Sequence, residues 1–183
     1  AALSGIDLRL DTAFAGMLSR DTGALVRLSS GDSVTARLVI GADGRDSAVR
    51  AAAGIEASTI RYGQKALAFT VSHAIPHGNV STEIYHEGGP FTLVPLPDSG
   101  GRPASAVVWM NPGPRALELA AMPTEAFEAE MSARSCHHLG PLTLTSPRRV
   151  WPIVTRRAAR LVAERTALMA EAAHVVPPIG AQG

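Results

Sequence analysis

The sequence contains little charge and no long apolar run. Charged residues make up 18% of its 183 residues and apolar residues 46%. A chain of this length and balance can bury a sizeable core, which favours one folded globular domain over disorder. The formal net charge is +1, so the balance of charge does not indicate a nucleic-acid-binding protein. No stretch approaches the roughly 20 apolar residues of a membrane span.

Cysteine and targeting signals are equally scarce. Cys136 is the only cysteine, so no intrachain disulfide can form, and a reducing compartment such as the cytoplasm is expected. A buried structural cysteine is the favoured interpretation, and a nucleophile is the alternative. No basic segment precedes an apolar one at the start, as a signal peptide requires. The chain begins with Ala1-Ala2-Leu3 rather than Met, which we interpret as an interior cut.

Alternating apolar and polar residues predict half-buried antiparallel strands in the first forty residues. The predicted strands are Ile6–Leu10, Ala24–Leu28 and Val34–Leu38, joined by turns at Asp21–Gly23 and Ser30–Asp32. Asp, Ser and Gly are residues that turns favour. The start of the chain is therefore expected to be a small antiparallel sheet.

The pattern then changes to the continuous apolar run Leu38–Ala42, which is typical of a strand buried on both faces. It ends in Asp43-Gly44, and Ser47–Ala53 predicts a short helix that Gly54 stops. A strand, a tight turn and a helix in this order indicate the βα unit of a nucleotide-binding sheet.

The middle of the chain predicts a second lobe built mostly from antiparallel strands. The strands expected from residue 66 onward are 66–71, 80–85, 91–96, 104–109, 148–155 and 165–169. Pro123-Thr124 begins a helix that reaches Arg134, with Thr124 as its cap and Glu125 near its positive end. The predicted fold class is therefore α/β, a partial nucleotide-binding sheet interrupted by a mostly antiparallel insertion.

The end of the chain concentrates residues that suit a ligand. Glu171 follows an expected strand at its carboxyl end, where α/β sheets place ligands. Its carboxylate can accept hydrogen bonds from sugar hydroxyls, although on position alone a helix-start acid is the favoured interpretation. His174 is interpreted as a packing or capping residue, with a catalytic base as the alternative.

Two prolines and two glycines follow this acid. Pro177-Pro178 fixes two φ angles and removes two N–H donors. Gly180 and Gly183 permit close backbone approach, and a helix after them would aim its N–H groups at an anion. An ordinary loop before a helix is the alternative.

Here the sequence resembles a known family, the FAD-dependent aromatic monooxygenases of the para-hydroxybenzoate hydroxylase type. Ala170-Glu171-Ala172-Ala173-His174 and Pro177-Pro178-Ile179-Gly180-Ala181-Gln182-Gly183 resemble the family's second flavin-contact motif. In that motif Gly-Asp-Ala-Ala-His is followed by Pro-Pro and two glycines, and Leu-Asn comes next. Gly41–Arg50 resembles the family's Asp-Gly motif. Both motifs occur in the family's order, with a strand-rich insertion between them.

Softer motifs resemble the ubiquinone-biosynthesis branch, which hydroxylates polyprenylated phenols. They are Tyr62-Gly63-Gln64, His86–Phe91, Leu93–Pro97 and Val107–Trp109. The chain departs from the family in carrying Ala170-Glu171 where members usually have Gly-Asp. It also contains no G-x-G-x-x-G for the ADP pyrophosphate and no Leu-Asn after Gly183, so we expect an internal fragment.

The resemblance implies a domain organisation, a reaction and a set of site residues. Residues 1–58 and 156–183 would be parts of an FAD-binding domain, and residues 59–155 a substrate-binding lobe. NAD(P)H would reduce FAD, and O₂ would supply the hydroxyl oxygen. The implied cofactor-binding residues are Asp43, Gly44, Ala170, Glu171, Pro178, Gly180, Ala181, Gln182 and Gly183.

The same resemblance implies roles for these residues. Glu171 would accept from the ribityl chain, and Asp43 and Gly44 would shape the turn near the pyrophosphate. The N–H groups through Gly183 would stabilise negative charge on the reduced flavin. The carbonyl of Pro178 would act in catalysis by orienting the phenolic hydroxyl.

The implied substrate residues are Trp151, Ile153 and Pro178, and core packing is the favoured alternative for the first two. The expected partner is a phenolic or prenylated small molecule. Because such a substrate carries a lipid tail, a cytoplasmic enzyme peripheral to the membrane, or one in a biosynthetic complex, is consistent with it.

Other interpretations stay open at this point. Arg148-Arg149 and Arg156-Arg157 are interpreted as solvated charge, with a site for NADPH phosphate or lipid head groups as the alternative. The histidines, including His137-His138, show no spacing of a metal site. A halogenase or quinone reductase keeps the fold, but the only lysine, Lys65, is expected in a turn before a strand. A non-catalytic interaction domain is the remaining alternative.

Overall fold

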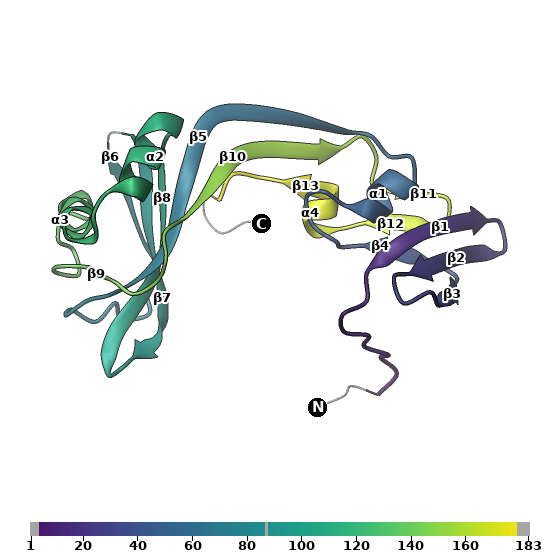
Figure 1. Cartoon of the computed structure of the whole chain (residues 1–183), viewed down its shortest axis with the longest axis horizontal. Helices are drawn as coiled ribbons and strands as arrows, with labels where there is room; N and C mark the ends of the chain where they lie inside the picture. The colour runs from purple at the N-terminus through teal and green to yellow at the C-terminus, as the bar shows by residue number, and fades with distance from the viewer. Residues whose placement is uncertain (1–3, 87, 179–183) are drawn as a thin grey trace. The chain divides into compact units, whose positions relative to one another are not determined.

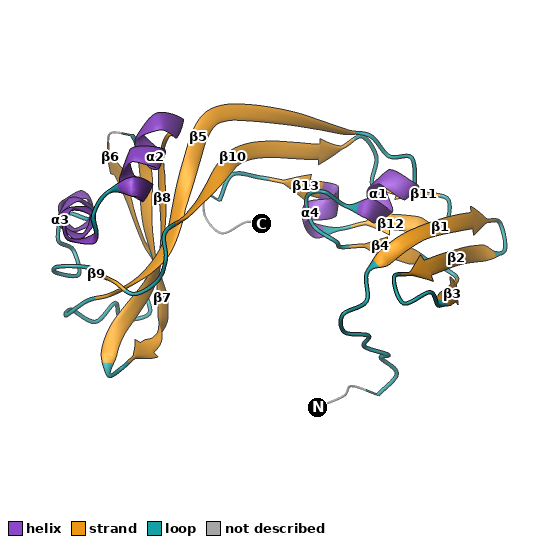
Figure 2. Ribbon diagram, in the orientation of Figure 1, coloured by secondary structure: helices purple, strands orange, loops and turns teal. Residues whose placement is uncertain are grey.

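The computed structural model describes residues 4–86 and 88–178 (Figure 1). The chain divides into two compact units, and each is described by itself. Unit 1 comprises residues 1–60 and 154–183, and unit 2 comprises residues 61–153. The divisions therefore lie near the boundaries expected at 58/59 and 155/156. Figure 2 shows that strands outnumber helices in both units.

Unit 1 begins with a three-stranded antiparallel sheet. Its strands, in spatial order, are β1 (Phe14–Arg20), β2 (Gly23–Leu28) and β3 (Ser33–Ala36). The two predicted strands that became β2 and β3 are confirmed. The strand predicted at Ile6–Leu10 is wrong: these residues adopt no regular structure, and Leu8 is 76% exposed. No described strand pairs with them, so their alternation buries no face.

A second sheet of unit 1 contains the predicted βα unit. Its strands, in spatial order, are β11 (Val162–Ala163), β12 (Thr166–Leu168) and β4 (Val39–Gly41). Helix α1 (Ala48–Ala52) follows β4, with Ser47 as its N-cap, and Gly54 has a φ of +62° beyond its end. The helix is therefore confirmed, together with its start and its stop.

The expected burial of β4 on both faces is wrong. Leu38 is 53% and Ile40 57% exposed. Strand β4 is an edge strand of its sheet, and among the described residues no element covers the Ile40 side. The other side packs into a small cluster. Its buried members are Val49, Ile55, Ala158, Leu168, Ala172 and Ala173.

The last elements of unit 1 are helix α4 (Ala170–Ala173) and strand β13 (His174–Val175). Strand β13 pairs antiparallel with the end of β10 (Arg149–Ala158), so that Arg157 stands opposite His174. Both short elements follow β12 directly, and they place the predicted ligand-contact stretch against the rest of unit 1.

Unit 2 is built on antiparallel strands. They are β5 (Ala57–Ser72), β6 (Thr82–His86), β7 (Gly89–Ser99) and β8 (Arg102–Pro112), with a two-residue strand β9 (Thr143–Leu144). The sheet order is β13-β10-β5-β8-β7-β6, and β9 pairs with β5. Strands β5 and β10 each have residues in both units. The predicted antiparallel insertion is confirmed.

Helices α2 (Gly113–Ala121) and α3 (Thr124–Arg134) pack on one face of this sheet. Every second residue of β5, β7 and β8 faces them, as the pleat of a strand requires. The buried members of this core are Leu67, Phe69, Val71, Phe91, Leu93, Val107, Trp109, Ala116, Leu119, Phe127, Met131, Leu139 and Leu142. On the opposite face, Ile153 packs with Ala66 and Met110.

Several predictions about unit 2 are wrong. Thr124 does not cap α3: the N-cap is Pro123, and no side chain donates or accepts a capping hydrogen bond. Cys136 is exposed rather than buried, because it lies in a turn after α3 with a φ of +52°. Lys65 lies within β5 rather than in a turn before a strand.

Arg148 is not solvated charge. Its Nη1 donates to the carbonyl oxygens of Leu119 at 2.9 Å and Met122 at 2.6 Å, at the end of α2. Its guanidinium carbon lies 4.7 Å from the centre of the Phe127 ring. The side chain satisfies carbonyls that the helix end leaves unpaired, so it joins α2 to α3.

Within residues 4–86 and 88–178, no helix is both long and apolar enough to cross a membrane. The same residues contain no group of three His, Cys, Asp or Glu side chains that could hold a metal ion.

Candidate functional site

Parallel pairing of β4 with β12 brings the two sequence motifs together. Gly41 stands opposite Leu168, and the Met169 N–H donates to the Gly41 carbonyl at 2.9 Å. A Cβ at position 41 would lie 2.9 Å from Leu168 Cδ2 and 3.0 Å from Val49 Cγ1. Only glycine allows this close packing of strand and helix. The Asp-Gly turn and the Glu171 turn therefore begin at one edge of the sheet.

Asp43 holds the first turn. Its Oδ1 accepts from the Ser47 hydroxyl, and its Oδ2 accepts from the Val49 N–H at 3.0 Å. Desolvation raises the pKa of Asp43, but the hydrogen bonds from Ser47 and Val49 outweigh it, so the pKa lies below its ordinary value. Gly44 follows with a φ of +84°. The predicted turn-shaping role is thus visible, whereas contact with a cofactor stays a prediction.

Arg50 joins the two turns. It is only 4% exposed, and its Nη1 donates to the Ala172 carbonyl at 2.9 Å while its Nη2 donates to the Arg45 carbonyl at 2.8 Å. Desolvation, followed by repulsion from Arg156, lowers the pKa of Arg50. A buried guanidinium is costly unless it is hydrogen-bonded, and these two carbonyls supply that compensation.

Sequence reasoning quoted Arg50 within the Asp-Gly motif but assigned it no role. The sequence feature that could have drawn attention to it is local. Arg50 is a long cationic residue in a helix of Ala and Val, one turn after a capping serine. Ser47 Oγ accepts a hydrogen bond from the backbone N–H of Arg50 at 2.9 Å. The capping serine therefore also fixes the backbone position of Arg50.

The second turn presents Glu171. The preceding Ala170 has a φ of +50°, in the left-handed region that glycine favours. Glu171 is exposed, and its carboxylate forms no ion pair within residues 4–86 and 88–178. Ala172 and Ala173 are buried in the core of unit 1. The acid is therefore held by a buried anchor and keeps its oxygens available as hydrogen-bond acceptors.

The remaining predicted residues are placed as follows. Pro178 is exposed at the end of the described chain, and Gly180, Ala181, Gln182 and Gly183 lie outside the described residues. His174 is exposed. Trp151 and Ile153 belong to unit 2, where Ile153 is a core residue and Trp151 is 46% exposed. Packing thus accounts for Ile153.

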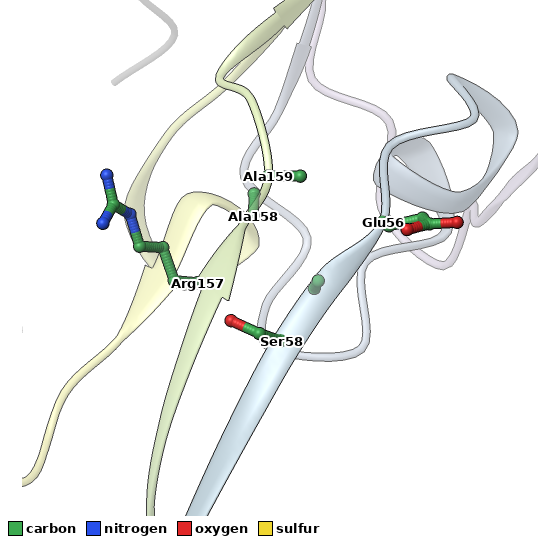
Figure 3. Close-up of a pocket in the computed structure, with 6 residues that line it drawn as sticks. Glu56, Ser58, Arg157, Ala158 and Ala159 are labelled. Atoms are coloured by element: carbon green, nitrogen blue, oxygen red, sulfur yellow. The ribbon is translucent and has the colours of Figure 1, made fainter.

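A shallow pocket of unit 1 opens between the start of β5 and the end of β10 (Figure 3). It is lined by Glu56, Ala57, Ser58, Arg157, Ala158 and Ala159. Figure 3 shows the side chains of Glu56 and Arg157 directed away from each other. The pocket therefore brings no acid and base together, and it includes no residue of the two motif turns.

The two turns suit one end of a flavin. An exposed carboxylate with unpaired oxygens can accept hydrogen bonds from a polyol such as a ribityl chain. It lies at the carboxyl end of a parallel strand, the edge at which α/β sheets bind nucleotides. The alanines after it are small, which lets a ligand approach the backbone. The residues present therefore fit the cofactor that the motifs imply.

The chain is similar to proteins that are already known. The model of the FAD-binding domain family matches residues 1–183. The ubiquinone hydroxylase UbiL of Rhodospirillum rubrum is 41% identical over 167 residues, which are 91% of this chain and 38% of that protein. The 3-demethoxyubiquinol 3-hydroxylase of Escherichia coli is 28% identical over 178 residues, covering 97% of this chain and 44% of that protein.

A solved structure shows the same fold. The crystal structure of P. aeruginosa PqsL in complex with 2-aminobenzoylacetate superposes with a TM-score of 0.75 at 25% identity, covering 94% of this chain and 48% of that one. The chain thus spans less than half the length of these relatives. Because the family model matches residues 1–183, the chain belongs to the FAD-binding domain family.

Proposed function

We propose that this chain is part of an FAD-dependent monooxygenase that hydroxylates a polyprenylated phenol with NAD(P)H and O₂ in ubiquinone biosynthesis. The observation that carries the proposal is the parallel pairing of β4 with β12, which sets the Asp-Gly turn beside the Glu171 turn. The names of the similar curated proteins, ubiquinone hydroxylase and 3-demethoxyubiquinol 3-hydroxylase, support the substrate class.

Each turn has its own part in holding the cofactor. Glu171 accepts hydrogen bonds from the ribityl hydroxyls, next to Ala170, whose backbone turns the chain. Asp43 and Gly44 shape the turn near the pyrophosphate. Arg50 fixes the distance between the two turns through its bonds to Arg45 and Ala172. When bound, FAD would supply the redox and oxygen chemistry. The protein binds and orients the cofactor and the substrate, and it excludes water from the site.

The residues after β13 act at the reacting end of the site. The N–H groups of Gly180, Ala181, Gln182 and Gly183 stabilise negative charge on the flavin ring. The Pro178 carbonyl accepts a hydrogen bond from the phenolic hydroxyl and so orients the ring of the substrate. In unit 2, Trp151 contacts the substrate, and Ile153 supports that surface from the core.

The substrate class also bears on location. A polyprenylated phenol resides in lipid, so an enzyme that takes it works at the membrane surface, either alone or in a biosynthetic complex. We therefore place the enzyme in the cytoplasm, in peripheral contact with the membrane.

The experiment that tests the site replaces Glu171 in the full-length protein. Glu171→Ala should weaken FAD retention severalfold, because ribityl hydroxyls lose their acceptor, while Glu171→Gln should retain part of it. The measurement is bound-flavin absorbance after desalting. Glu164→Ala removes another exposed acid of unit 1 and serves as the matched control. Retention unchanged in Glu171→Ala would contradict the assignment.

A second pair of measurements tests the glycine turn and the reaction. Gly180→Val should abolish bound-flavin absorbance while the far-UV circular dichroism stays native. The wild-type protein should oxidise NAD(P)H in response to a polyprenylated phenol and yield a product heavier by one oxygen. A halogenated product, or no product with flavin bound, would refute the monooxygenase assignment.

A further inference from the structure

Arginine and histidine side chains gather where β10 ends against β13. Arg157 and His174 are direct cross-strand neighbours, so their side chains leave the same face of the pair with Cβ atoms about 5 Å apart. Arg160 follows two residues after the end of β10, and its Nη2 makes one long bond to the Gly54 carbonyl at 3.4 Å. All three side chains are exposed.

The nearby acids do not neutralise this group. Asp46 pairs with Arg156, with Nη1 and Oδ1 2.6 Å apart. Glu56 points away from Arg157 in Figure 3. In the described ranges 4–86 and 88–178, no carboxylate forms an ion pair with Arg157, Arg160 or His174.

These side chains border a depression rather than a flat surface. It encloses about 360 Å³, at the lower end of the range typical of ligand pockets. The residues that line it come from two segments, 155–161 and 173–176. They include Arg156, Arg157, Arg160 and His174 and no acid. Three arginines and one histidine from two segments of the chain thus border one space.

We propose that this depression is a phosphate-binding subsite, with Arg157 and Arg160 as its cations and His174 as a further donor. Guanidinium groups match phosphate oxygens in bidentate geometry, and a group with three terminal oxygens can occupy all three donors. Arg156 does not contribute its charge, because Asp46 already holds it. The subsite does not depend on the proposed hydroxylation, since binding of phosphate requires no turnover.

The test measures binding of pyrophosphate to the full-length, flavin-loaded protein by calorimetry. Arg157→Gln should weaken saturable binding about fivefold or more, as expected for loss of a charge-assisted contact. Arg160→Gln should act in the same direction. Arg149→Gln removes an exposed arginine of the same strand, outside the depression, and should change the dissociation constant less than about twofold.

Two further titrations identify the source of the phosphate. If Arg157→Gln weakens binding of NADPH, the subsite takes a nucleotide phosphate. If it weakens binding to phosphatidylglycerol vesicles and leaves phosphatidylcholine vesicles unaffected, the subsite takes a lipid head group. Either outcome supports the proposal.

Three outcomes overturn it. In the first, pyrophosphate does not bind saturably. In the second, Arg149→Gln weakens binding as much as Arg157→Gln does, which would indicate only a diffuse positive electrostatic field. In the third, pyrophosphate binds but neither nucleotide nor vesicle binding responds to Arg157→Gln, so that the depression holds an adventitious ion only. Far-UV circular dichroism of each variant checks that the fold is retained.

Discussion

The two units are held together in different ways. Unit 2 contains both tryptophans, both tyrosines and three of the four phenylalanines, and Phe14 is the only aromatic residue of unit 1. Phe69, Trp109 and Phe127 pack edge to face or tilted within one core. The buried cluster of unit 1 holds six residues, all aliphatic, and three of them are alanines.

This difference explains where the candidate site is vulnerable. Apolar area is the main source of stability in a core, and unit 1 buries little of it. Its motif turns depend instead on Asp43, Ser47 and Arg50, whose bonds join α1 to the turn after β4 and to α4. Unit 2 should therefore respond most to lost volume, and the site in unit 1 to lost hydrogen bonds.

The largest effect is expected from Phe127→Ala in unit 2. Phe127 is fully buried and lies edge-on to Phe69, with ring centres 5.1 Å apart. Its removal should lower the free energy of unfolding by about 3–5 kcal/mol. Urea denaturation followed by tryptophan fluorescence measures this, because both tryptophans lie in unit 2. Phe14→Ala in unit 1 should cost clearly less when unfolding is followed by far-UV circular dichroism, which reports on both units, and an equal cost would contradict the comparison.

Arg50→Gln should have the next largest effect, confined to unit 1. It removes the donors to the buried Ala172 carbonyl and to the partly buried Arg45 carbonyl, which costs about 2–3 kcal/mol. Hydrogen exchange of the Met169 amide, which donates to Gly41, should become faster. The fluorescence transition of unit 2 should not move. Slow exchange at Met169 in this variant would show that packing alone holds the turns together.

Asp43 should make the free energy of unfolding of unit 1 depend on pH. Because its pKa is lowered in the folded state, its contribution is fully present above the unfolded value near 4 and is lost as pH falls through the folded value. Asp43→Ala should cost about 1 kcal/mol near neutral pH. That difference should shrink below pH 4 in urea titrations. A constant difference down to pH 2 would contradict the hydrogen-bonded carboxylate.

The smallest effect is expected from Ala170→Gly, and it should be stabilising. Ala170 adopts a φ of +50°, which costs an L-residue about 1 kcal/mol or more and glycine almost nothing. After the entropy of glycine in the unfolded chain is subtracted, a gain of about 0.5–1 kcal/mol remains. Thermal unfolding monitored by far-UV circular dichroism measures it. A loss of stability would mean that the methyl group of Ala170 packs usefully.

The sequence predicted the elements whose signals are local. Alternation found β2 and β3, and the Asp-Gly motif with Ser47 and Gly54 found α1. Strand β1 was missed because a bulge between Phe14 and Gly16 interrupts its alternation. Ile6–Leu10 alternates well, but a strand needs a partner, which periodicity does not reveal. Helix α2 was missed because its first turn contains Gly113 and Pro114.

For the site, the sequence pointed to Asp43, Gly44 and Glu171 but not to their mutual arrangement. That arrangement depends on the parallel register of β4 with β12, a contact between distant segments. Arg50 and Arg148 show the same limit. Each contacts a carbonyl far along the chain, and a local pattern, such as the capping serine before Arg50, does not identify that distant partner.

The parallel pairing of β4 with β12 also bears on the order in which the protein folds. The two strands are separated by all of unit 2, so their pairing closes a very long loop. The entropic cost of closing a loop increases with the length of the loop, and pairing between distant segments slows folding. Pulse-labelling hydrogen exchange should show the Met169 amide protected after the amides of β8. The two motif turns would then form last, after the folding of unit 2 has brought β4 and β12 close together.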